Sequence, residues 1–328
     1  MDQRDNYKCF IKVGLVMIYD KGVREFVDHI NTISGNKYDV SVLVSIGVEN
    51  DTTQVNDSPG KYYLSGLHDR DNSVLMVSNK KFPDFIARAV YNINQVREVV
   101  SSRSRDVILE PVVDGYFRGQ SFALWAEHRP ISGRKVIREF QKILMHGQVF
   151  SFLCHLAKDG AKTKLTSDEI LEYVDSPLRC IESNAGQSIQ IRSIAEQALT
   201  RLANEEWRPI TTIQHSDFWL GNILLQKSKN RPLSNDYGFC VIDWSGALLN
   251  GAPVFDFIRY CMSSNVSITR AKKESAKYLE AIQISQDEMI FYLVIALGNI
   301  GLNLEEFPES RFFDMCNNCL SYCLKIKY

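Results

Sequence analysis

The pattern of apolar residues changes near Gly133, and this change constrains the fold more than any other feature of the chain. Between residues 38 and 128, short apolar runs are separated by turn residues, which is typical of the strands of a small sheet. These runs read YDVSVLVSIG, KYYLSGL, NSVLMVS, DVILEPVV and QSFALWAE. After Gly133, apolar residues recur every three to four positions, which is typical of helices. We therefore predict an α+β fold with a strand-rich N-terminal part and a mainly helical C-terminal part.

One predicted helix interrupts the strands. It begins near Pro83, because proline is favoured in the first turn of a helix and an apolar stripe at helical spacing surrounds this position. The stripe consists of Phe82, Ile86, Val90, Ile93, Val96 and Val100. The predicted order is three strands, one helix and two further strands.

Three segments of the C-terminal part carry the clearest helical signals. Two are apolar stripes, formed by Val136, Phe140, Ile143 and Leu144 and by Ile194, Ala198, Leu199 and Leu202. In the third segment, Ser285 and Glu288 have the spacing of a capping box and precede MIFYLVIAL. This last run is apolar all round, so we predict a buried helix.

Residues 1–37 fit this division less clearly. CFIKVGLVMIY could be a strand and VREFVDHINTI a short helix, and the segment could begin the small lobe or form an extension. No Pro/Gly/Ser-rich linker divides the rest of the chain, so we expect two lobes that share a tight connection. The predicted boundaries are 1–37, 38–128 for the small lobe and 129–328 for the large lobe.

Charge and hydropathy argue against two classes of partner. The formal charge is −1 and there is no long basic run, which disfavours binding to the phosphate backbone of nucleic acid. The longest apolar stretch, from Phe291 to Leu302, has about half of the ~20 residues that a membrane span needs. The N-terminus lacks the apolar centre of a signal peptide. We expect a cytoplasmic protein that binds neither nucleic acid nor membrane.

Cysteines form one close cluster, at Cys316, Cys319 and Cys323. Zinc normally takes four ligands, and neither a second CxxC nor a histidine pair lies nearby in the sequence. The same spacing also places the three thiols on one face of a helix. We therefore expect reduced, buried thiols, with a metal site as the alternative.

The most informative segments are ITTIQHSDFWLGNILLQ and YGFCVIDWSGALLNGAPVFDFIRY. Two strand-like runs, ILL and CVI, adjoin Asn222 and Asp243, which can therefore face one another across a hairpin, with Asp217 on the incoming loop. Phosphoryl transfer needs a carboxylate to orient the acceptor hydroxyl and oxygen ligands to hold magnesium. Alternatively, the same residues are ordinary turn and strand-end residues with local hydrogen bonds.

This pattern resembles a known family. HSDFWLGN is similar to the HxDxxxxN catalytic loop of the aminoglycoside phosphotransferase and choline kinase families, and VIDW with GAPVFD resembles their metal-binding and structural aspartates. The resemblance implies a bilobal protein-kinase-like fold. It implies that Asp217 is the catalytic base and that Asn222 and Asp243 are Mg²⁺ ligands. His215 and Asp256 would support the geometry of the catalytic loop.

The resemblance also implies a nucleotide site for ATP or GTP as co-substrate. QSFALWAEHRPISG resembles the segment that joins the lobes, so the adenine edge is expected near Glu127 and His128. An ordinary edge strand with a loop is the alternative. The phosphate-covering loop would be VSIGVENDTT, in which Gly47 is the one glycine.

The sequence departs from the family at the phosphate-binding lysine of the third strand. Met76 occupies the matching position, and FIARAVYNI lacks the glutamate that would pair with this lysine. Lys80 paired with Glu98 is our first candidate for a substitute, and Lys61 on the preceding strand is the second. Both lysines could also be ordinary surface residues.

The leading functional hypothesis is an O-phosphotransferase that acts on a small-molecule acceptor, either an amine, a sugar or an amino alcohol. Acceptor specificity is expected in residues 134–206, whose acidic side chains could bind a cationic acceptor or simply be solvated. They are Asp168, Glu169, Glu172, Asp175 and Glu182. A second hypothesis, motivated by Met76, is a weak or inactive kinase-like binding module. A third is an unrelated hydrolase that uses Asp217 and His215.

Overall fold

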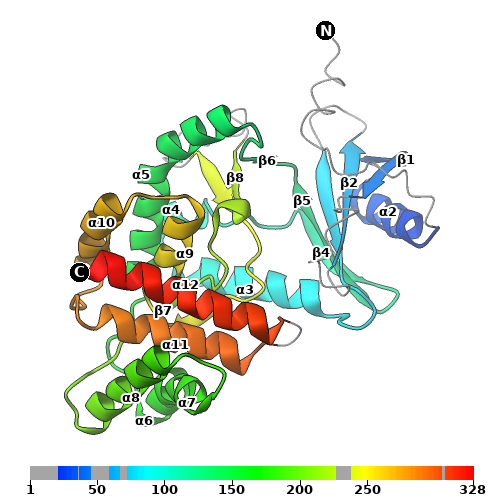
Figure 1. Ribbon diagram of the computed structural model, residues 1–328. Coiled ribbons are helices and arrows are strands. Elements are labelled where there is room, and N and C mark those ends of the chain that lie inside the picture. The colour runs from blue at the N-terminus through cyan, green and yellow to red at the C-terminus, as the bar shows by residue number, and fades with distance from the viewer. Residues whose placement is uncertain (1–20, 36, 46–58, 67–71, 227–237, 305–306) are drawn as a thin grey trace.

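A small strand-rich lobe lies beside a larger helical lobe, and the long helix α3 extends from one toward the other (Figure 1). The computed structural model describes residues 21–35, 37–45, 59–66, 72–226, 238–304 and 307–328. The arrangement confirms the predicted α+β, protein-kinase-like fold with a small antiparallel sheet and a mainly helical C-terminal lobe. The strand predicted for CFIKVGLVMIY and the residue Gly47 lie outside the described residues.

The small lobe contains a five-stranded antiparallel sheet in the order β1-β2-β3-β5-β4. Its strands are β1 (Tyr38–Ser45), β2 (Gly60–Gly66), β3 (Ser73–Val77), β4 (Val113–Phe117) and β5 (Gln120–Ala126). The strand predicted for DVILEPVV is wrong over most of its length, since β4 begins at its last residue. In this run Val107 and Ile108 join the core of the large lobe, where Ile108 makes an isolated bridge to Val241.

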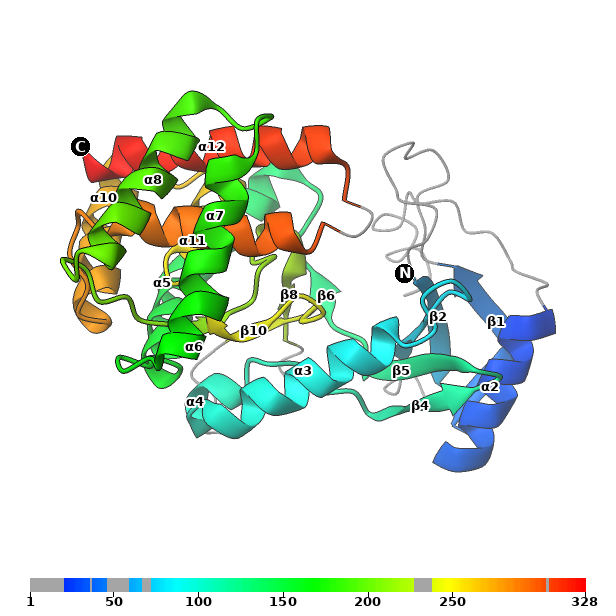
Figure 2. The same cartoon turned by 90° about the horizontal axis from the view of Figure 1, so that it is seen from below.

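One helix covers each face of this sheet (Figure 2). Helix α2 (Lys21–Ser34) confirms the short helix predicted within residues 1–37, and it packs on the face that presents Leu75 and Val77. Helix α3 (Phe85–Val99) packs through Ile86 and Val90 on the opposite face. Successive strand residues point to opposite faces, which is why Met76 turns toward α3. The lobe boundaries predicted above stay predictions.

Two buried serines attach the beginning of α3 to the sheet. Ser78 accepts a hydrogen bond from the backbone N–H of Ile86 at 2.9 Å, and Ser121 accepts one from Ala87 at 3.1 Å. The two hydroxyl groups also contact each other at 2.7 Å. They satisfy N–H groups that a helix leaves unpaired in its first turn, so α3 begins after Asp84.

The large lobe is built from helices around α11 (Met289–Leu302). Ten consecutive residues of α11, Met289 to Gly298, are buried, and a fully buried Leu or Phe side chain contributes about 1.5–3 kcal/mol. Both bonds of the predicted capping box are present, between Ser285 and Glu288. The other helices are α4 (Ser102–Arg105), α5 (Lys135–Asp159), α6 (Ser167–Ile170), α7 (Ser176–Ser183), α8 (Ile189–Ala203), α9 (Phe255–Ser263), α10 (Ile268–Ala281) and α12 (Glu309–Lys327), with a π-helical turn at Leu171–Asp175.

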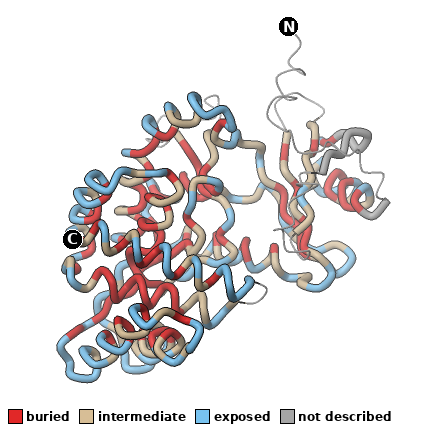
Figure 3. Tube along the Cα trace, viewed as in Figure 1, coloured by how far each residue is buried: buried red, intermediate tan, exposed pale blue. Residues whose placement is uncertain are grey.

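Helix α5 corrects one expectation. The predicted helix is present, but its first stripe points to solvent, with Val136, Phe140, Ile143 and Leu144 between 61% and 82% exposed. The buried face lies elsewhere on the helix, at Met145, Val149, Phe152 and Leu153. Periodicity identifies a helix, but it does not show how far the neighbouring elements extend along it. The first turns of α5 carry exposed residues at the edge of the lobe (Figure 3).

Helix α12 buries the clustered cysteines. Cys316, Cys319 and Cys323 all lie on its buried face, as expected for helix thiols. Burial raises the pKa of the Cys319 thiol to about 11, so the protonated form is favoured near neutral pH. Among the described helices, none is both long and apolar enough to span a membrane.

Candidate active site

Two short sheets in the large lobe position the predicted catalytic loop. One pairs β7 (Thr212–Gln214) with β10 (Leu248–Gly251), and the other has the order β6-β8-β9. The latter strands are β6 (Arg129–Pro130), β8 (Ile223–Leu225) and β9 (Phe239–Val241). The loop runs from the end of β7 through a short 3₁₀ turn (Leu220–Asn222) to the start of β8.

The β8–β9 hairpin brings Asn222 and Asp243 to the same end, as the sequence predicted. Ile223 lies opposite Val241, and Ile242 N–H donates a hydrogen bond to the Asn222 carbonyl at 3.0 Å. Asp243 follows directly and has a positive φ of 65°. Left-handed backbone is uncommon outside glycine, and Asp tolerates it better than most residues. The hairpin therefore places an amide and a carboxylate at one edge.

Asp217 lies beside this pair and has a hydrogen-bond donor on each carboxylate oxygen. Oδ2 accepts from Asn222 Nδ2 at 3.0 Å and from Trp219 Nε1 at 3.1 Å. Oδ1 is 3.4 Å from Arg259 Nη2. Burial raises the pKa of Asp217, while the Arg259 charge lowers it and the Asp243 charge raises it. The carboxylate is thus held by fixed donors and is still half exposed.

Trp219 reaches Asp217 because of a glycine in the loop. The indole ring lies over the backbone at Gly221, where the β-carbon of any other residue would collide with it. Trp219 is 42% exposed and lies on the Oδ2 side of the carboxylate, to which its Nε1–H donates. The glycine at position 221 is therefore required because only glycine leaves room for the Trp219 ring.

His215 is a buried part of the loop and is fully enclosed. Asp217 N–H donates to its Nδ1 at 3.3 Å, so Nε2 carries the proton and donates to the Ile242 carbonyl at 2.9 Å. Burial lowers the pKa of His215 to about 4, and the ring is neutral near pH 7. Both ring nitrogens are occupied by backbone groups, which contradicts the hypothesis of a hydrolase that uses His215 on its substrate.

Asp256, in the first turn of α9, binds the backbone of the same loop. Its carboxylate accepts hydrogen bonds from the backbone N–H groups of His215 at 2.6 Å and Ser216 at 3.1 Å. These bonds hold Ser216 with a positive φ of 70°. Val254, just before α9, has a φ of 83°, which is a strained conformation for a β-branched residue. Such strain often gathers near functional sites, where the surrounding structure enforces it.

The residues at the hairpin end fit a magnesium ion by their chemistry. Asn222 uses its amide nitrogen on Asp217, which leaves the amide oxygen as its donor atom toward a metal. Asp243 contributes carboxylate oxygens, one of which accepts from Ser245 Oγ at 3.0 Å. Mg²⁺ is typically held by one or two such protein oxygens together with substrate phosphates and waters. Among the described residues, no group of three or more His, Cys, Asp or Glu side chains is placed to hold a metal ion by itself.

The small lobe does not provide the lysine–glutamate pair in its expected place. Met76 on β3 packs against Ile86 and Val90 of α3, so an apolar contact fills this position. Lys80 lies between β3 and α3, whereas Glu98 is in the last turn of α3, about 20 Å from the first residue of this helix at 1.5 Å per residue. This separation along α3 disfavours the suggested Lys80–Glu98 pair, which stays a prediction.

Lys61 has the better geometry of the two lysines. It lies directly opposite Met76 in the β2–β3 register, and residues directly opposite one another point to the same face of a sheet. Its exposed side chain therefore emerges on the α3 face, where the phosphate-binding cation was expected.

The segment between β5 and β6 joins the two lobes and contains Glu127 and His128. Glu127 N–H donates to the carbonyl of Asn72 at 2.9 Å, and its carboxylate accepts from Asn72 Nδ2 at 3.3 Å. This N–H is thus engaged in extending the sheet. A nucleotide base that pairs with this connection has to use neighbouring backbone groups.

Three residues that the sequence did not single out contribute to the site. Trp219 and Arg259 contact Asp217, and Asn92 on α3 donates to the carbonyls of Trp244 and Ser245 at 3.2 and 3.0 Å. Arg259 could have been found, because it follows Asp256 by three residues and so shares its helical face. Asn92 lacks a local signal, since its partners are more than 150 residues away.

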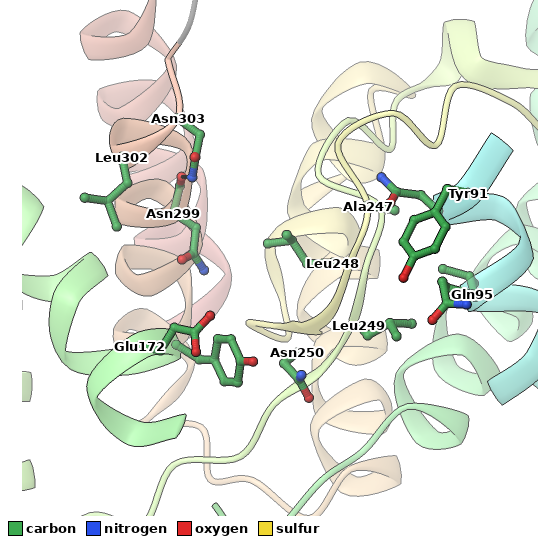
Figure 4. Close-up of a pocket in the computed structure, with 13 residues that line it drawn as sticks. Tyr91, Gln95, Glu172, Ala247, Leu248, Leu249, Asn250, Asn299, Leu302 and Asn303 are labelled. Atoms are coloured by element: carbon green, nitrogen blue, oxygen red, sulfur yellow. Dashed lines mark hydrogen bonds between the residues drawn. The ribbon is translucent and has the colours of Figure 1, made fainter. Parts of the chain in front are cut away.

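A pocket of about 410 Å³ adjoins the segment that follows Asp243 (Figure 4). Leu248 in its wall lies opposite Gln214, three residues before Asp217. The pocket extends from α3 across β10 to α11, and Glu172 and Tyr173 of the π-helical turn close one side. Its polar side chains are Tyr91, Asn92, Gln95, Glu172, Tyr173, Asn250, Asn299 and Asn303. Among the described residues of the lining, Glu172 is the one acidic side chain, and none is Lys or Arg.

Comparison with known proteins shows the fold. No protein-family model matches the chain, and no curated protein matches its sequence. A solved structure from Haemophilus somnus, assigned as a fructosamine-3-kinase, superposes with a TM-score of 0.50 at 9% identity, covering 92% of this chain and 96% of that one. This likeness shows the protein-kinase-like fold, and at such low identity it does not show the activity.

Two further solved structures resemble the chain more weakly. A choline kinase from Streptococcus pneumoniae has a TM-score of 0.48 and 12% identity, covering 92% of this chain and 99% of that one. An ethanolamine kinase from Plasmodium vivax has a TM-score of 0.46 and 11% identity, covering 98% and 94%. The solved structures that resemble this chain thus include small-molecule kinases.

Proposed function

We propose that this protein is a phosphotransferase that moves the γ-phosphate of ATP or GTP to a hydroxyl group of a small-molecule acceptor. The observation that carries the proposal is the grouping of Asp217, Asn222 and Asp243 at one end of the β8–β9 hairpin. These residues supply a base and two oxygen ligands within one loop. Phosphoryl transfer depends mainly on such positioning and on electrostatic stabilisation.

Each residue of the loop has a distinct proposed role. Asp217 accepts the hydrogen bond of the acceptor hydroxyl and orients it for attack, as a carboxylate with fixed donors can do. Asn222 and Asp243 would hold Mg²⁺, which neutralises charge on the nucleotide phosphates when bound. His215 and Asp256 would keep the loop in its conformation by accepting hydrogen bonds from its backbone N–H groups.

The pocket beside β10 is our candidate for the acceptor site. Amide and phenol groups can both donate to and accept from hydroxyl groups, which suits a polar acceptor. Among the five acidic residues noted in residues 134–206, Glu172 lines this pocket, whereas Glu169 bonds Lys162 and Asp175 bonds Arg179. With one carboxylate and no lysine or arginine among its described lining residues, the pocket favours an uncharged or amine-bearing acceptor over an anionic one.

A thermal-shift assay tests nucleotide binding before the acceptor is known. The wild-type chain should be stabilised by ATP or GTP with Mg²⁺ and less so with either component alone. A ligand at 100 times its Kd stabilises a protein by about 2.7 kcal/mol. Nucleotide consumption against a panel of amines, sugars and amino alcohols then identifies the acceptor. No shift with either nucleotide would contradict the proposal.

The second candidate function is an inactive kinase-like module that binds a ligand or a partner. The apolar packing of Met76 favours it, because a methionine cannot pair with phosphate oxygens. An acceptor-panel compound that stabilises the chain without any effect of nucleotide or Mg²⁺ would support this function.

If the chain is an active enzyme, Lys61 is our candidate for the cation that replaces the missing lysine. Lys61→Ala should weaken Mg²⁺–nucleotide affinity by roughly tenfold, which corresponds to about 1.4 kcal/mol for a lost charge-assisted contact. Isothermal titration at fixed Mg²⁺ measures this change. Lys80→Ala is the matched control, since Lys80 lies outside the strands. A loss in Lys80→Ala with none in Lys61→Ala would reverse the assignment.

A further inference from the structure

Helix α9 presents two ionisable side chains to the proposed catalytic loop. Asp256 and Arg259 are three residues apart and therefore lie on one face of the helix. Asp256 binds the backbone of His215 and Ser216, and Arg259 approaches the side chain of Asp217. One rigid element thus contacts both the backbone of the loop and its reactive carboxylate.

The two oxygens of Asp217 have different surroundings. Oδ2 accepts from the neutral donors of Trp219 and Asn222, which use its two lone pairs. Oδ1 has one contact with the described residues, the 3.4 Å approach of Arg259 Nη2. This distance is at the long end for a hydrogen bond, so Oδ1 keeps capacity for one more donor. Oδ1 is therefore the oxygen that can accept an acceptor hydroxyl.

Arg259 is itself held in place by burial. Its side chain is 27% exposed, and its Nε atom is buried without a hydrogen-bond partner among the described residues. A guanidinium group has planar geometry and stays charged at all relevant pH values, so it can fix the plane of a neighbouring carboxylate where an ammonium group acts as a point charge. Removing Asp217 would leave this cation partly buried without its carboxylate partner.

We propose that Arg259 is a positioning residue for Asp217, which it holds from the Oδ1 side so that this oxygen faces the incoming acceptor hydroxyl. The inference rests on the proposed phosphotransferase function. It assigns to α9 a task beyond the loop support of Asp256. Trp219 and Asn222 fix one oxygen of the base, and Arg259 sets the direction of the other.

Steady-state kinetics with the acceptor found in the panel test this role. Arg259→Gln should lower kcat by on the order of 100-fold, the cost expected for a reacting group displaced by about 1 Å, with the KM for nucleotide unchanged. Arg259→Lys should recover part of this loss. Added guanidinium ion should restore turnover in Arg259→Ala but not in Asp217→Asn. A residue with a merely structural role would show neither recovery.

The control is Arg138→Gln, which removes an exposed Arg138–Glu139 pair of 3.6 Å on α5, outside the loop and the described lining of the candidate acceptor pocket. It should leave kcat unchanged. The proposal is overturned if Arg259→Gln turns over like wild type, or if it loses nucleotide affinity and kcat together while guanidinium fails to rescue Arg259→Ala.

A double-mutant cycle separates this inference from the proposed function. Denaturation midpoints of wild type, Arg259→Gln, Asp217→Asn and the double variant should be non-additive, because the two side chains share one contact. If the changes in midpoint are additive, the Arg259–Asp217 contact is refuted, whether or not the chain transfers phosphate. Non-additive midpoints in a chain that transfers no phosphate to any panel acceptor would refute the proposed function, and with it the positioning role, while leaving the contact established.

Discussion

Asp217→Asn is expected to reduce phosphoryl transfer by about 10²- to 10⁴-fold, the usual contribution of a positioned general base. Asparagine has nearly the same shape and can keep a contact with Trp219 or Asn222, so the fold should change little. It cannot accept a proton from the acceptor hydroxyl at the oxygen that faces Arg259. Turnover at saturating nucleotide and acceptor measures the loss.

The affinity for nucleotide separates this effect from general damage. Because Asp217 is proposed to act on the acceptor, Mg²⁺–nucleotide binding by Asp217→Asn should match wild type. The matched control is Asp287→Asn, which should keep full turnover. Asp287 precedes α11, is 80% exposed and pairs with Lys327. Equal turnover in Asp217→Asn would remove this residue from the mechanism.

Asp243→Asn is expected to weaken Mg²⁺-dependent nucleotide binding by roughly tenfold or more, by analogy with the losses that follow disruption of metal sites. Asparagine is the suitable replacement because it tolerates the positive φ of 65° at this position, whereas alanine would add backbone strain. The substitution removes the negative charge from the proposed metal site and leaves the backbone in place.

Titrations of nucleotide at several Mg²⁺ concentrations measure this effect. Wild type should bind more tightly as Mg²⁺ rises, and Asp243→Asn should respond less. Without Mg²⁺ the two chains should bind nucleotide similarly, or the variant slightly better because a negative charge is gone. Superimposable titrations would show that Asp243 is not a metal ligand.

Local sequence patterns determined the elements and the central hairpin of this protein. Apolar periodicity identified α3, α5 and α8, and a capping box before an all-apolar run identified α11, because each signal is read within one segment. Alternation of apolar runs identified four of the five strands of the small lobe. The placement of Asn222 and Asp243 also followed from local order, since two short strands that pair bring the residues at their ends together.

Tertiary structure decided whatever depends on contacts between distant segments. The stripe of α5 is exposed because none of the described elements packs over it, and the first part of DVILEPVV joins the large lobe because Ile108 meets Val241. The length of α3 separates Lys80 from Glu98, while strand register places Lys61 opposite Met76. Arg259 acquires its proposed role only when α9 packs against the catalytic loop, 42 residues from Asp217 in the sequence. Spacing along a chain specifies local geometry, and the meeting of remote surfaces depends on the packing of the whole fold.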